Sequence, residues 1–361
     1  MYIMITISLC MIVKNEEEVI GRCLECVKDI VDEIIIVDTG STDSTKEIVS
    51  KYTDMVYDFE WIDDFSAARN FSFSKASKDY TMWLDADDII LEADREKLLK
   101  IKESLDTSID IVMAKYNVSF DENGNPTLSY YRERLFKRSS NHKWVDPIHE
   151  VVPLFGEVFY SDIAISHKKL HRQDPLRNLR IFEKMISEGK TLEPRHQFYY
   201  SRELYYNARY KEAIEGFTKF LDSSRGWIED CISACRDLAT CYYLINDEKS
   251  ALYSLFRSFE FDEPRAEICC DIGKHMFDRQ KYKEAIFWYK VALTRDKNDT
   301  NGGFKSNDCY GYIPSIQLSV CYDRLGESDK AIYYHEKTKE IKPNDSAVLH
   351  NENYFSKFKN S

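Results

Sequence analysis

The stretch TMWLDADDII, residues 81–90, runs from apolar residues directly into three carboxylates, Asp85, Asp87 and Asp88. The apolar part is typical of a buried strand. Acids packed together repel one another, and burying them costs free energy unless a cation or hydrogen-bond donors compensate. The stretch therefore predicts a strand that ends at a charged site, for which the rest of the chain must supply the compensating groups.

Apolar runs and amphipathic helical segments alternate through roughly the first 165 residues. Strands are predicted for four segments, ITISLCMIV, EIIIVD, MVYDFEW and YTMWLD. Helices are predicted from about Glu16, with Asn15 as the N-cap, and in the segments STDSTKEIVSKY and FSAARNFSFSKAS. This alternation predicts a mainly parallel sheet covered by helices, and the uninterrupted apolar runs fit strands that are buried on both faces.

The pattern changes after Asp88, for which an acid at a helix N-terminus is the alternative to a place in the charged site. Two long segments around the turn DENGNP, IDIVMAKYNVSF before it and TLSYYRERLFKR after it, predict an antiparallel hairpin. A loop, SSNHKWVDPIHE, follows the hairpin, and short strands that end at AISHKKL follow the loop.

From about residue 175 the chain is predicted to be helical and repetitive. Four alanines share one phase, with separations of 38, 34 and 46 residues: Ala213, Ala251, Ala285 and Ala331. Twelve positions before each alanine stands a small residue that follows a bulky one: Ser201, Ala239, Gly273 and Ser319. This pattern suits closely packed helix pairs and resembles the tetratricopeptide repeat, whose unit has about 34 residues. The polar segment NDTNGGFKSNDCYG accounts for the longest separation.

The overall composition favours a soluble, cytoplasmic protein. The 361 residues carry a formal net charge of -12, which argues against a nonspecific nucleic-acid binder. No apolar run approaches the roughly 20 residues of a membrane-spanning helix, so an integral membrane protein is not expected. Ten cysteines without a secretion signal fit a reducing compartment, and Cys23 and Cys26 are assigned to core packing rather than to metal or redox chemistry.

Two predicted strands end in acids, at Asp38 and at Asp85. Because the carboxyl ends of parallel strands meet at one edge of a sheet, where ligands bind, both acids are expected at that edge. Asp85 and Asp87 are two residues apart and point the same way if the chain is extended. Hard oxygen ligands suit Mg²⁺ or Mn²⁺, and such metals leave coordination positions for substrate phosphates.

Four segments together carry a resemblance to a known family: SLCMIVKNEEEVIGRCL, EIIIVDTGSTDST, DFSAARNFSFSKAS and WLDADD. They resemble the family 2 glycosyltransferases, which have the GT-A fold, over the first 170 residues or so. The later segments RERLFKR, HKWVDPIHE, ISHKKL and PLRNLRIFEKM, followed by the repeats, resemble a bacterial group that includes the peptide glycosyltransferases of bacteriocins, which act on cysteine or serine.

The resemblance implies a nucleotide-sugar donor, usually a UDP-sugar. It places uracil against Asp38, with Ile12 and Glu16 walling the base. It places the ribose at Asp85 beside Ala86, and Arg69 beneath the nucleotide next to the acids; a surface position on a helix is the alternative for Arg69.

The resemblance also implies a divalent metal, Mn²⁺ or Mg²⁺, bound by Asp87. His167, at the end of a predicted strand, fits the late histidine ligand of GT-A enzymes, although the residues KKL follow it here instead of a glycine and an aromatic residue. His171 is a nearby competitor, and an ordinary structural histidine is the other interpretation of His167.

Inverting transfer needs a base for the acceptor, and a carboxylate within reach of its proton would serve. By position and resemblance Glu150 is the candidate, with Asp146 as the runner-up and His149 orienting the base or contacting a phosphate. A structural ion pair from Glu150 to Arg132 or Arg134 is the alternative.

The sequence thus predicts a metal-dependent, inverting hexosyltransferase that moves a sugar from a UDP-sugar to a peptide or protein side chain. We expect a GT-A catalytic domain at 1–172, a linking helix at 173–194, tetratricopeptide-like repeats at 195–345 and a C-terminal tail at 346–361. The repeats would present the acceptor or mediate a homodimer. A cell-envelope saccharide or lipid-linked acceptor, and a non-catalytic scaffold that senses sugar nucleotides, are the alternatives.

Overall fold

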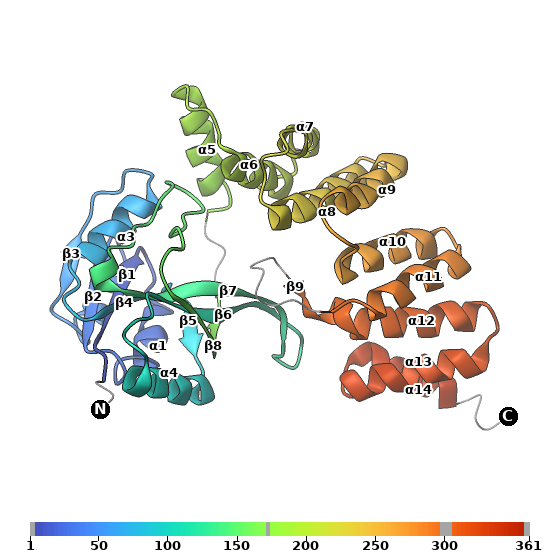
Figure 1. Ribbon diagram of the computed structural model, residues 1–361, viewed down its shortest axis with the longest axis horizontal. Coiled ribbons are helices and arrows are strands. Elements are labelled where there is room, and N and C mark those ends of the chain that lie inside the picture. The colour runs from blue at the N-terminus through green and yellow to red at the C-terminus, as the bar shows by residue number, and fades with distance from the viewer. Residues whose placement is uncertain (1–3, 171–173, 297–304, 357–361) are drawn as a thin grey trace. The chain divides into compact units, whose positions relative to one another are not determined.

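A computed structural model of the chain describes residues 4–170, 174–296 and 305–356. Two compact units divide it: unit 1 comprises Met1–Ser119 and Ser129–Lys190, and unit 2 comprises Phe120–Leu128 and Thr191–Ser361. Unit 1 is built around a twisted sheet with helices against it, and unit 2 consists largely of stacked helices (Figure 1). Each unit is described by itself below.

The sheet has the strand order β3-β2-β1-β4-β7-β6-β8-β5. Its first four strands are β3 (Val56–Asp58), β2 (Glu33–Asp38), β1 (Ile7–Val13) and β4 (Tyr80–Trp83). They pair in parallel, with Val13 opposite Asp38 and Cys10 opposite Trp83. The predicted parallel arrangement is therefore confirmed for this half, and Asp38 and Asp85 lie at the same edge of the sheet.

The other half of the sheet is mixed. It contains β7 (Pro126–Lys137), β6 (Ile111–Phe120), β8 (Val158–His167) and β5 (Asp88–Ile90). The predicted hairpin corresponds to β6 and β7, which are neighbours in the sheet, and β7 pairs antiparallel with β4. The short strands expected before AISHKKL are one long strand, β8, which pairs in parallel with β6 and antiparallel with β5.

Helices pack on both faces of this sheet. The apolar side chains of α1 (Ile20–Glu25), α2 (Thr45–Val49) and α4 (Glu92–Ser104) join one core with the strands. Helix α3 (Phe65–Ser74) lies on the opposite face, where Phe73 packs with residues of β1, β2 and β4. Helix α5 (Arg177–Ser187) follows in the same unit. Cys23 is fully buried and Cys26 half-buried in the first core, in keeping with their assignment to packing.

The first helix does not begin where the sequence suggested. Asn15 has a left-handed backbone, with φ of 55°, and α1 starts only at Ile20. The Asn15 side chain instead accepts a hydrogen bond from the backbone N–H of Thr42, and the backbone N–H of Glu16 donates to the Thr45 hydroxyl. The residues after β1 thus form a loop that is tied to the turn after β2.

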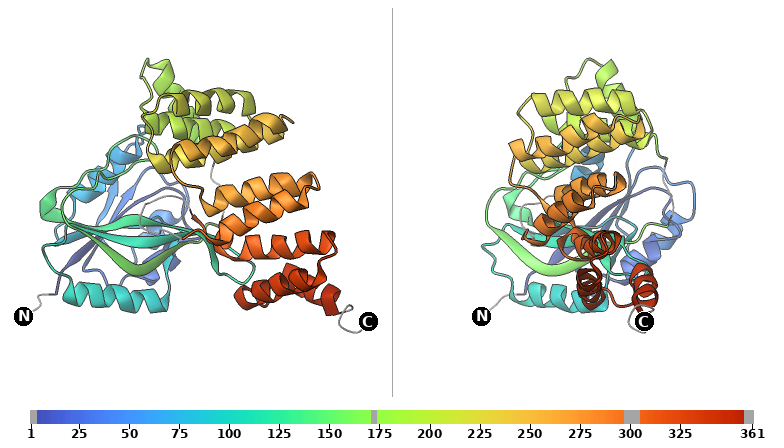
Figure 2. Two further views of the ribbon diagram at one scale, coloured as in Figure 1. Left: turned by 45° about the vertical axis from the view of Figure 1, so that its right-hand side comes forward. Right: turned by 90° about the vertical axis from the view of Figure 1, so that its right-hand side faces the viewer.

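The described residues of unit 2 form four successive helix pairs and a final helix, stacked one upon another in the views of Figures 1 and 2. The pairs are α6 (Pro194–Tyr206) with α7 (Tyr210–Asp222), α8 (Ile228–Leu244) with α9 (Glu248–Arg257), α10 (Ala266–Asp278) with α11 (Tyr282–Leu293), and α12 (Tyr312–Arg324) with α13 (Ser328–Ile341). All four phased alanines are completely buried.

The small residues permit close helix contacts, as predicted. A Cβ on Gly273 would come within 2.7 Å of the Tyr289 ring, so only glycine fits there. The Ser319 hydroxyl donates to the carbonyl of Ala331 on the partner helix at 2.8 Å. Unit 2 therefore has the packing of tetratricopeptide-like repeats.

The segment assigned to a C-terminal tail is helical over its described length. Residues Ser346–Ser356 form helix α14, in which Val348 and Phe355 are buried, and Phe355 packs against His335 of α13. The sequence missed this helix because it has no counterpart to the phased alanine. Within the described part of the chain, no helix has both the length and the apolar character needed to cross a bilayer.

Candidate active site

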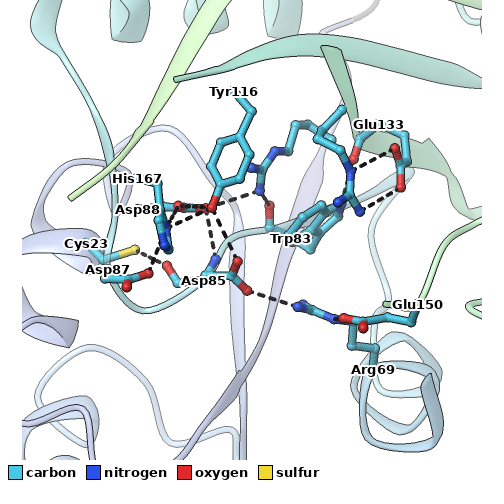
Figure 3. Close-up of polar contacts among 12 residues, drawn as sticks. Cys23, Arg69, Trp83, Asp85, Asp87, Asp88, Tyr116, Glu133, Glu150 and His167 are labelled. Carbon is cyan, nitrogen blue, oxygen red and sulfur yellow. Dashed lines mark hydrogen bonds and ion pairs between the residues drawn. The ribbon is translucent and has the colours of Figure 1, made fainter. Parts of the chain in front are cut away.

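The acid cluster after β4 forms a tight turn at the carboxyl edge of the parallel strands. The backbone N–H of Asp88 donates to the carbonyl of Asp85, and the backbone N–H of Asp85 donates to the Asp88 side chain, both at 3.0 Å. Figure 3 shows the three acids gathered near His167, Tyr116 and Arg69. The turn therefore brings all three carboxylates into one cluster rather than spreading them along a helix.

Asp88 is the most deeply buried of the three acids, and it opens strand β5 instead of a helix. Its Oδ2 lies 3.2 Å from Nη1 of Arg134, whose side chain is also fully buried. Its Oδ1 accepts a hydrogen bond from the Tyr116 hydroxyl at 2.9 Å. The alternative of an acid at a helix N-terminus is therefore wrong, because compensating groups from β6 and β7 allow Asp88 to enter the sheet.

His167 faces this cluster because it stands opposite Asp88 in the β5–β8 ladder. Its Nδ1 lies 3.1 Å from Oδ1 of Asp87, 3.2 Å from Oδ1 of Asp88 and 2.8 Å from the Tyr116 hydroxyl. Burial by itself would lower the pKa of His167, but the two carboxylates outweigh burial and raise it to about 10. In the absence of another cation, the imidazole is therefore protonated at neutral pH.

The cluster has the donor set of a divalent-metal site. One ligand atom each from Asp85, Asp88 and His167 lie within 4.8 Å of one another, which is the single such group among the residues that the structure describes. Carboxylate oxygens and an imidazole nitrogen suit Mn²⁺, and the oxygens suit Mg²⁺. Of the two predicted ligands, His167 belongs to this group, and Asp87 is in contact with His167. His171 lies outside the described residues.

Arg69 joins the acid cluster to the loop that carries Glu150. Its Nη2 lies 2.9 Å from Oδ1 of Asp85 and its Nε lies 2.7 Å from Oε1 of Glu150. The guanidinium carbon is 4.8 Å from the ring centroids of both Trp83 and Trp144. Arg69 is only 7% exposed, so the surface alternative is wrong and the position beside the acids is the observed one.

Electrostatics keep Asp85 ionised. Burial would raise the pKa of its carboxyl group, but Arg69, followed by Arg134, outweighs burial and lowers the pKa to about 2. Glu150 and Asp85 in turn raise the pKa of Arg69, although burial by itself would lower it. Charge compensation in this cluster is thus mutual, as the sequence argument required.

The predicted base, Glu150, is paired with Arg69 and not with the two arginines named as alternatives. Arg132 instead pairs with Glu133, and Arg134 with Asp88. Glu150 lies in the loop between β7 and β8, beside His149, whose ring stacks on Phe182 with centroids 6.0 Å apart.

The same loop is held in an uncommon backbone conformation. His149 has φ of 52° and Asp146 has φ of 76°. Non-glycine residues rarely adopt such angles, and they do so mainly where surrounding structure holds them. The loop therefore presents Glu150 from a constrained backbone, with Asp146 in a second left-handed position four residues earlier.

Asp38, at the end of strand β2, has one carboxylate oxygen without a hydrogen-bond partner among the described residues. Its Oδ1 accepts hydrogen bonds from the backbone N–H groups of Gly40 and Ser41, each at 2.9 Å. Its Oδ2 is buried and has no hydrogen-bond partner among the residues described. A buried polar atom usually has a partner, so Oδ2 is suited to a donor on a ligand.

The other predicted nucleotide-contacting residues flank this edge. Ile12 pairs with Val37 near the end of β1, and Glu16 is half-buried in the loop that follows. Ala86 is buried between Asp85 and Asp87. The structure therefore gathers Asp85, Asp87, His167, Arg69 and Glu150 around the acid cluster. His149 precedes Glu150 in the chain, but its ring packs on Phe182, while Ile12, Glu16 and Asp38 lie at or just beyond the ends of β1 and β2.

Sequence reasoning missed Tyr116 and Arg134 and undervalued Asp88. Arg134 also stacks on Trp83, with its guanidinium carbon 3.8 Å from the ring centroid. A signal was present, because an arginine inside the apolar part of a predicted strand needs a buried acid as partner. The single residue Tyr116 gave no comparable signal.

The comparisons agree with this geometry. Residues 8–159 match the family model "Glycosyl transferase family 2". The TPR repeat-containing protein Synpcc7942_0270 of Synechococcus elongatus is 39% identical over 151 residues, which are 41% of this chain and 36% of the relative. The SPbeta prophage-derived glycosyltransferase SunS of Bacillus subtilis is 29% identical over 231 residues, 60% of this chain and 54% of the relative.

Among solved structures, the tetratricopeptide protein YrrB, described as having an unusual peptide-binding site, covers 50% of this chain and 84% of its own. Its sequence identity is 19% and the TM-score is 0.38. The chain spans 36% of the length of the Synechococcus relative and 54% of the length of SunS. Residues 8–159 of the N-terminal unit therefore form a glycosyl transferase family 2 domain, and the helix pairs of unit 2, with the tetratricopeptide-like packing described above, follow it.

Proposed function

We propose that unit 1 transfers a hexose, with inversion, from a UDP-sugar to the side chain of a peptide or protein, and that it uses Mn²⁺ or Mg²⁺. The observation that carries this proposal is that two features lie at the same edge of the sheet. Strand β2 ends at Asp38, whose buried Oδ2 has no hydrogen-bond partner among the described residues. The parallel strand β4 leads to the cluster around Asp85, whose side chains are of the kinds that bind divalent metals.

Asp38 would bind the uracil ring. Its Oδ2 accepts the ring N–H, while Gly40 and Ser41 already hold Oδ1 and so fix the orientation of the carboxylate. A base that lacks an N–H at this position would leave the buried oxygen unsatisfied, at a cost of about 1–3 kcal/mol. Ile12 and Glu16 would line the two sides of the ring.

The acid cluster would hold the diphosphate end of the donor. A divalent metal supplies positive charge that offsets the negative charge on the departing diphosphate. Asp87 and His167 are the proposed ligands, and Asp85 and Asp88 lie close enough to His167 to bind the same ion. Arg69 fixes Oδ1 of Asp85, and Oδ2, which the Tyr116 hydroxyl contacts at 3.5 Å, would accept a further hydrogen bond from the ribose beside Ala86.

Glu150 is the proposed base. As the acceptor oxygen or sulfur bonds to the anomeric carbon, the bond from that carbon to the diphosphate breaks and the acceptor proton passes to Glu150. Arg69 holds Oε1, and within the described part of the chain no hydrogen bond engages Oε2, which is therefore available for the proton. His149, stacked on Phe182, limits the positions that the loop can take.

A peptide or protein is the proposed acceptor because unit 2 is a repeat array. Such arrays form extended concave surfaces that suit extended chains. The first helices of three successive pairs carry aromatic and charged side chains. Examples are the exposed Tyr206 on α6 and the ion pair between Arg236 on α8 and Asp271 on α10.

Calorimetric titration of UDP into the full chain, with and without Mn²⁺, tests the donor site. We expect metal-dependent binding that Asp87→Ala abolishes. Asp54→Ala is the matched control, since Asp54 is an exposed acid that precedes strand β3 and so lies away from the carboxyl edge of the sheet. No binding of UDP would contradict the UDP assignment, and titrations of GDP and dTDP would then separate another nucleotide donor from a protein without one.

Transfer assays with UDP-hexoses and cysteine- or serine-containing peptides test the base. Glu150→Gln should lower turnover by about 10²–10⁴-fold with a serine acceptor while UDP binding is retained. The loss should be smaller with a cysteine acceptor, because a thiol is more acidic than an alcohol. Asp146→Asn is the control from the same loop, and unchanged turnover in Glu150→Gln would remove Glu150 from the mechanism.

A further inference from the structure

A separate pocket lies at the beginning of the repeats, within unit 2. Its volume is about 410 Å³, and it is lined by Glu193, Pro194, Arg195, Arg225, Trp227 and Asp230. Pro194 and Arg195 open helix α6, and Trp227 stands directly before helix α8. Its volume falls within the usual range for small-molecule sites. None of the residues of the acid cluster contributes to it.

Asp230 is the unusual member of this lining. It is only 3% exposed, yet its carboxylate makes no hydrogen bond or ion pair with any residue that the structure describes. Burial raises the pKa of Asp230 to about 6, against the opposing charges of Arg195 and Arg202. A buried acid normally has partners, so a carboxylate that lines a pocket without one is suited to a hydrogen-bond donor from a ligand.

Trp227 gives the pocket a flat apolar surface. It is 49% exposed although it is a large aromatic residue, and it belongs to the short connection between α7 and α8. The residue before it, Gly226, lies so close to α7 that a Cβ there would come within 2.4 Å of the Phe220 ring. This close approach constrains the path of the connection that carries Trp227 to the pocket.

The charges of the lining cancel. Two acids, Glu193 and Asp230, stand with two guanidinium groups, Arg195 and Arg225. At the rim, Nη2 of Arg225 lies 3.0 Å from Oε2 of Glu193, and both side chains are about two-thirds exposed. The pocket thus offers donors and acceptors with no net charge, which favours a neutral ligand with several polar groups over an isolated cation or anion.

We propose that this pocket binds the pyranose ring of a neutral sugar. A face of C–H groups on the ring would pack on the indole of Trp227, and a hydroxyl would donate to the carboxylate of Asp230. Other hydroxyls would accept from the rim guanidinium of Arg225, which has N–H groups beyond the one that contacts Glu193. An amine ligand would find the same indole and carboxylate but would be opposed by the two guanidinium groups.

The inference goes beyond the proposed transfer reaction, because it concerns a site in unit 2 that needs neither nucleotide nor metal. A sugar site in the repeats would let the protein bind a glycan that is already attached to an acceptor or is part of one. The two sources share the same ring chemistry, so free glycosides and a glycosylated peptide serve as the two arms of the test.

Saturation-transfer NMR and titrations of the full chain would test the proposal, in EDTA and without nucleotide. The probes are the methyl β-glycosides of glucose, galactose and N-acetylglucosamine. We expect at least one of them to bind with a dissociation constant on the order of 1 mM. Trp227→Ala and Asp230→Asn should each weaken that binding at least tenfold.

Two controls locate the bound sugar. Tyr253→Ala removes another exposed aromatic residue of unit 2, on α9, and should leave binding unchanged. Asp87→Ala disables the candidate donor site and should also leave glycoside binding unchanged. Thermal melting and circular dichroism of every variant show whether the helices are intact, and the conservative Asp230→Asn remains informative if Trp227→Ala does not fold.

The proposal is overturned if none of the three glycosides binds, if binding survives both pocket variants, or if Asp87→Ala removes it. Binding of n-butylamine that depends on Trp227, without glycoside binding, would overturn it in favour of an amine ligand. Tighter binding of a β-glucosylated serine peptide than of the methyl glycoside would support a peptide-linked sugar, and equal affinity would support recognition of the sugar alone. Failure of UDP binding in unit 1 would leave each of these outcomes unchanged.

Discussion

Two buried acids of this molecule, Asp88 in unit 1 and Asp230 in unit 2, are treated in opposite ways. Asp88 is fully buried and has Arg134, Tyr116 and a backbone N–H as partners. Asp230 is almost as deeply buried and has none in the described part of the chain. The fold itself supplies the hydrogen bonds and the ion pair of Asp88, whereas Asp230 would obtain a hydrogen-bond partner only from a molecule that enters the pocket.

This difference in partners distinguishes a site that the fold organises in advance from a site whose carboxylate acquires a partner only when a ligand binds. In unit 1, guanidinium groups hold the acids ionised and in place, which suits a cluster that must receive a metal and a diphosphate without rearrangement. In unit 2, an acid of raised pKa is kept beside an exposed indole at a cost to stability. Binding sites commonly contain residues that lower the stability of the fold, because stability and function compete there.

The largest expected effect comes from breaking the compensated acid. Arg134→Met should destabilise unit 1 by about 3–5 kcal/mol, because it removes the fully buried guanidinium that pairs with Asp88 and leaves His167 as the remaining cationic neighbour of that charge. Urea denaturation monitored by tryptophan fluorescence measures this loss. Arg138→Met is the control, since the Arg138 side chain makes an exposed contact with the Lys78 carbonyl, and its effect should stay below about 1 kcal/mol. Equal effects of the two variants would contradict the compensation argument.

The next effect concerns the competition between a proton and a metal at His167. Because the pKa of His167 is raised to about 10, the imidazole must lose its proton before it can bind a metal. Mg²⁺ or Mn²⁺ binding should therefore tighten about tenfold per pH unit, or about 100-fold from pH 6.5 to 8.5. Asp85, with a pKa of about 2, is ionised throughout and contributes nothing to this dependence.

Calorimetry in two buffers of different ionisation enthalpy measures the same competition directly. We expect one proton released for each metal bound in the wild-type chain and none in His167→Asn. Metal binding that neither releases a proton nor varies with pH would show that His167 stays paired with Asp87 and Asp88 and is not a ligand.

A smaller effect, of opposite sign, is expected at Asp230. Its folded pKa lies above its unfolded value, so the charged form costs stability at pH above about 6, and the cost disappears as the pH falls below the unfolded value near 4. Asp230→Asn should thus stabilise unit 2 by about 3 kcal/mol at pH 8 and by only about 0.5 kcal/mol at pH 4. Thermal melts at both pH values measure this; a destabilised variant at pH 8 would mean that the carboxylate has an internal partner after all.

The smallest effect tests a satisfied polar group in the same repeats. Ser319→Ala removes the buried hydrogen bond to the Ala331 carbonyl and should destabilise unit 2 by about 1 kcal/mol at every pH. The neighbouring exposed variant Ser328→Ala, at the start of α13, provides the baseline. If Ser319→Ala and Asp230→Asn changed stability in the same direction, the contrast between satisfied and unsatisfied groups would fail within unit 2.

Much of the fold was predictable because its signals are local and periodic. The strands β1, β2 and β4 were evident from apolar runs, and the helix pairs of unit 2 from the phase of four alanines. The short strand β5 and helix α14 were not predictable in this way. β5 is three residues long and exists because β8 pairs with it, and α14 lies outside the repeat pattern.

The candidate site was predictable at the positions where charge follows an apolar run. Asp38, Asp85 and Arg69 lie where the sequence placed them, at the sheet edge and beside the acids. The partners of Asp88 were missed because they come from β6 and β7, whose register against β4 and β8 depends on tertiary pairing. The Arg69–Glu150 pair spans 81 residues of sequence, so no local pattern reveals it.

The pairing of β5 with β8 makes the acid cluster sensitive to chain length as well as to residue identity. Side chains alternate between the faces of a strand, so one added residue between Asp85 and Asp88 would bring a different residue opposite His167 and turn the aspartate to the other face. Replacing Ala86 by serine would leave this spacing intact, whereas a single insertion after Ala86 would separate the acids from the imidazole. Variation in this segment should therefore be confined to substitutions, with insertions and deletions excluded.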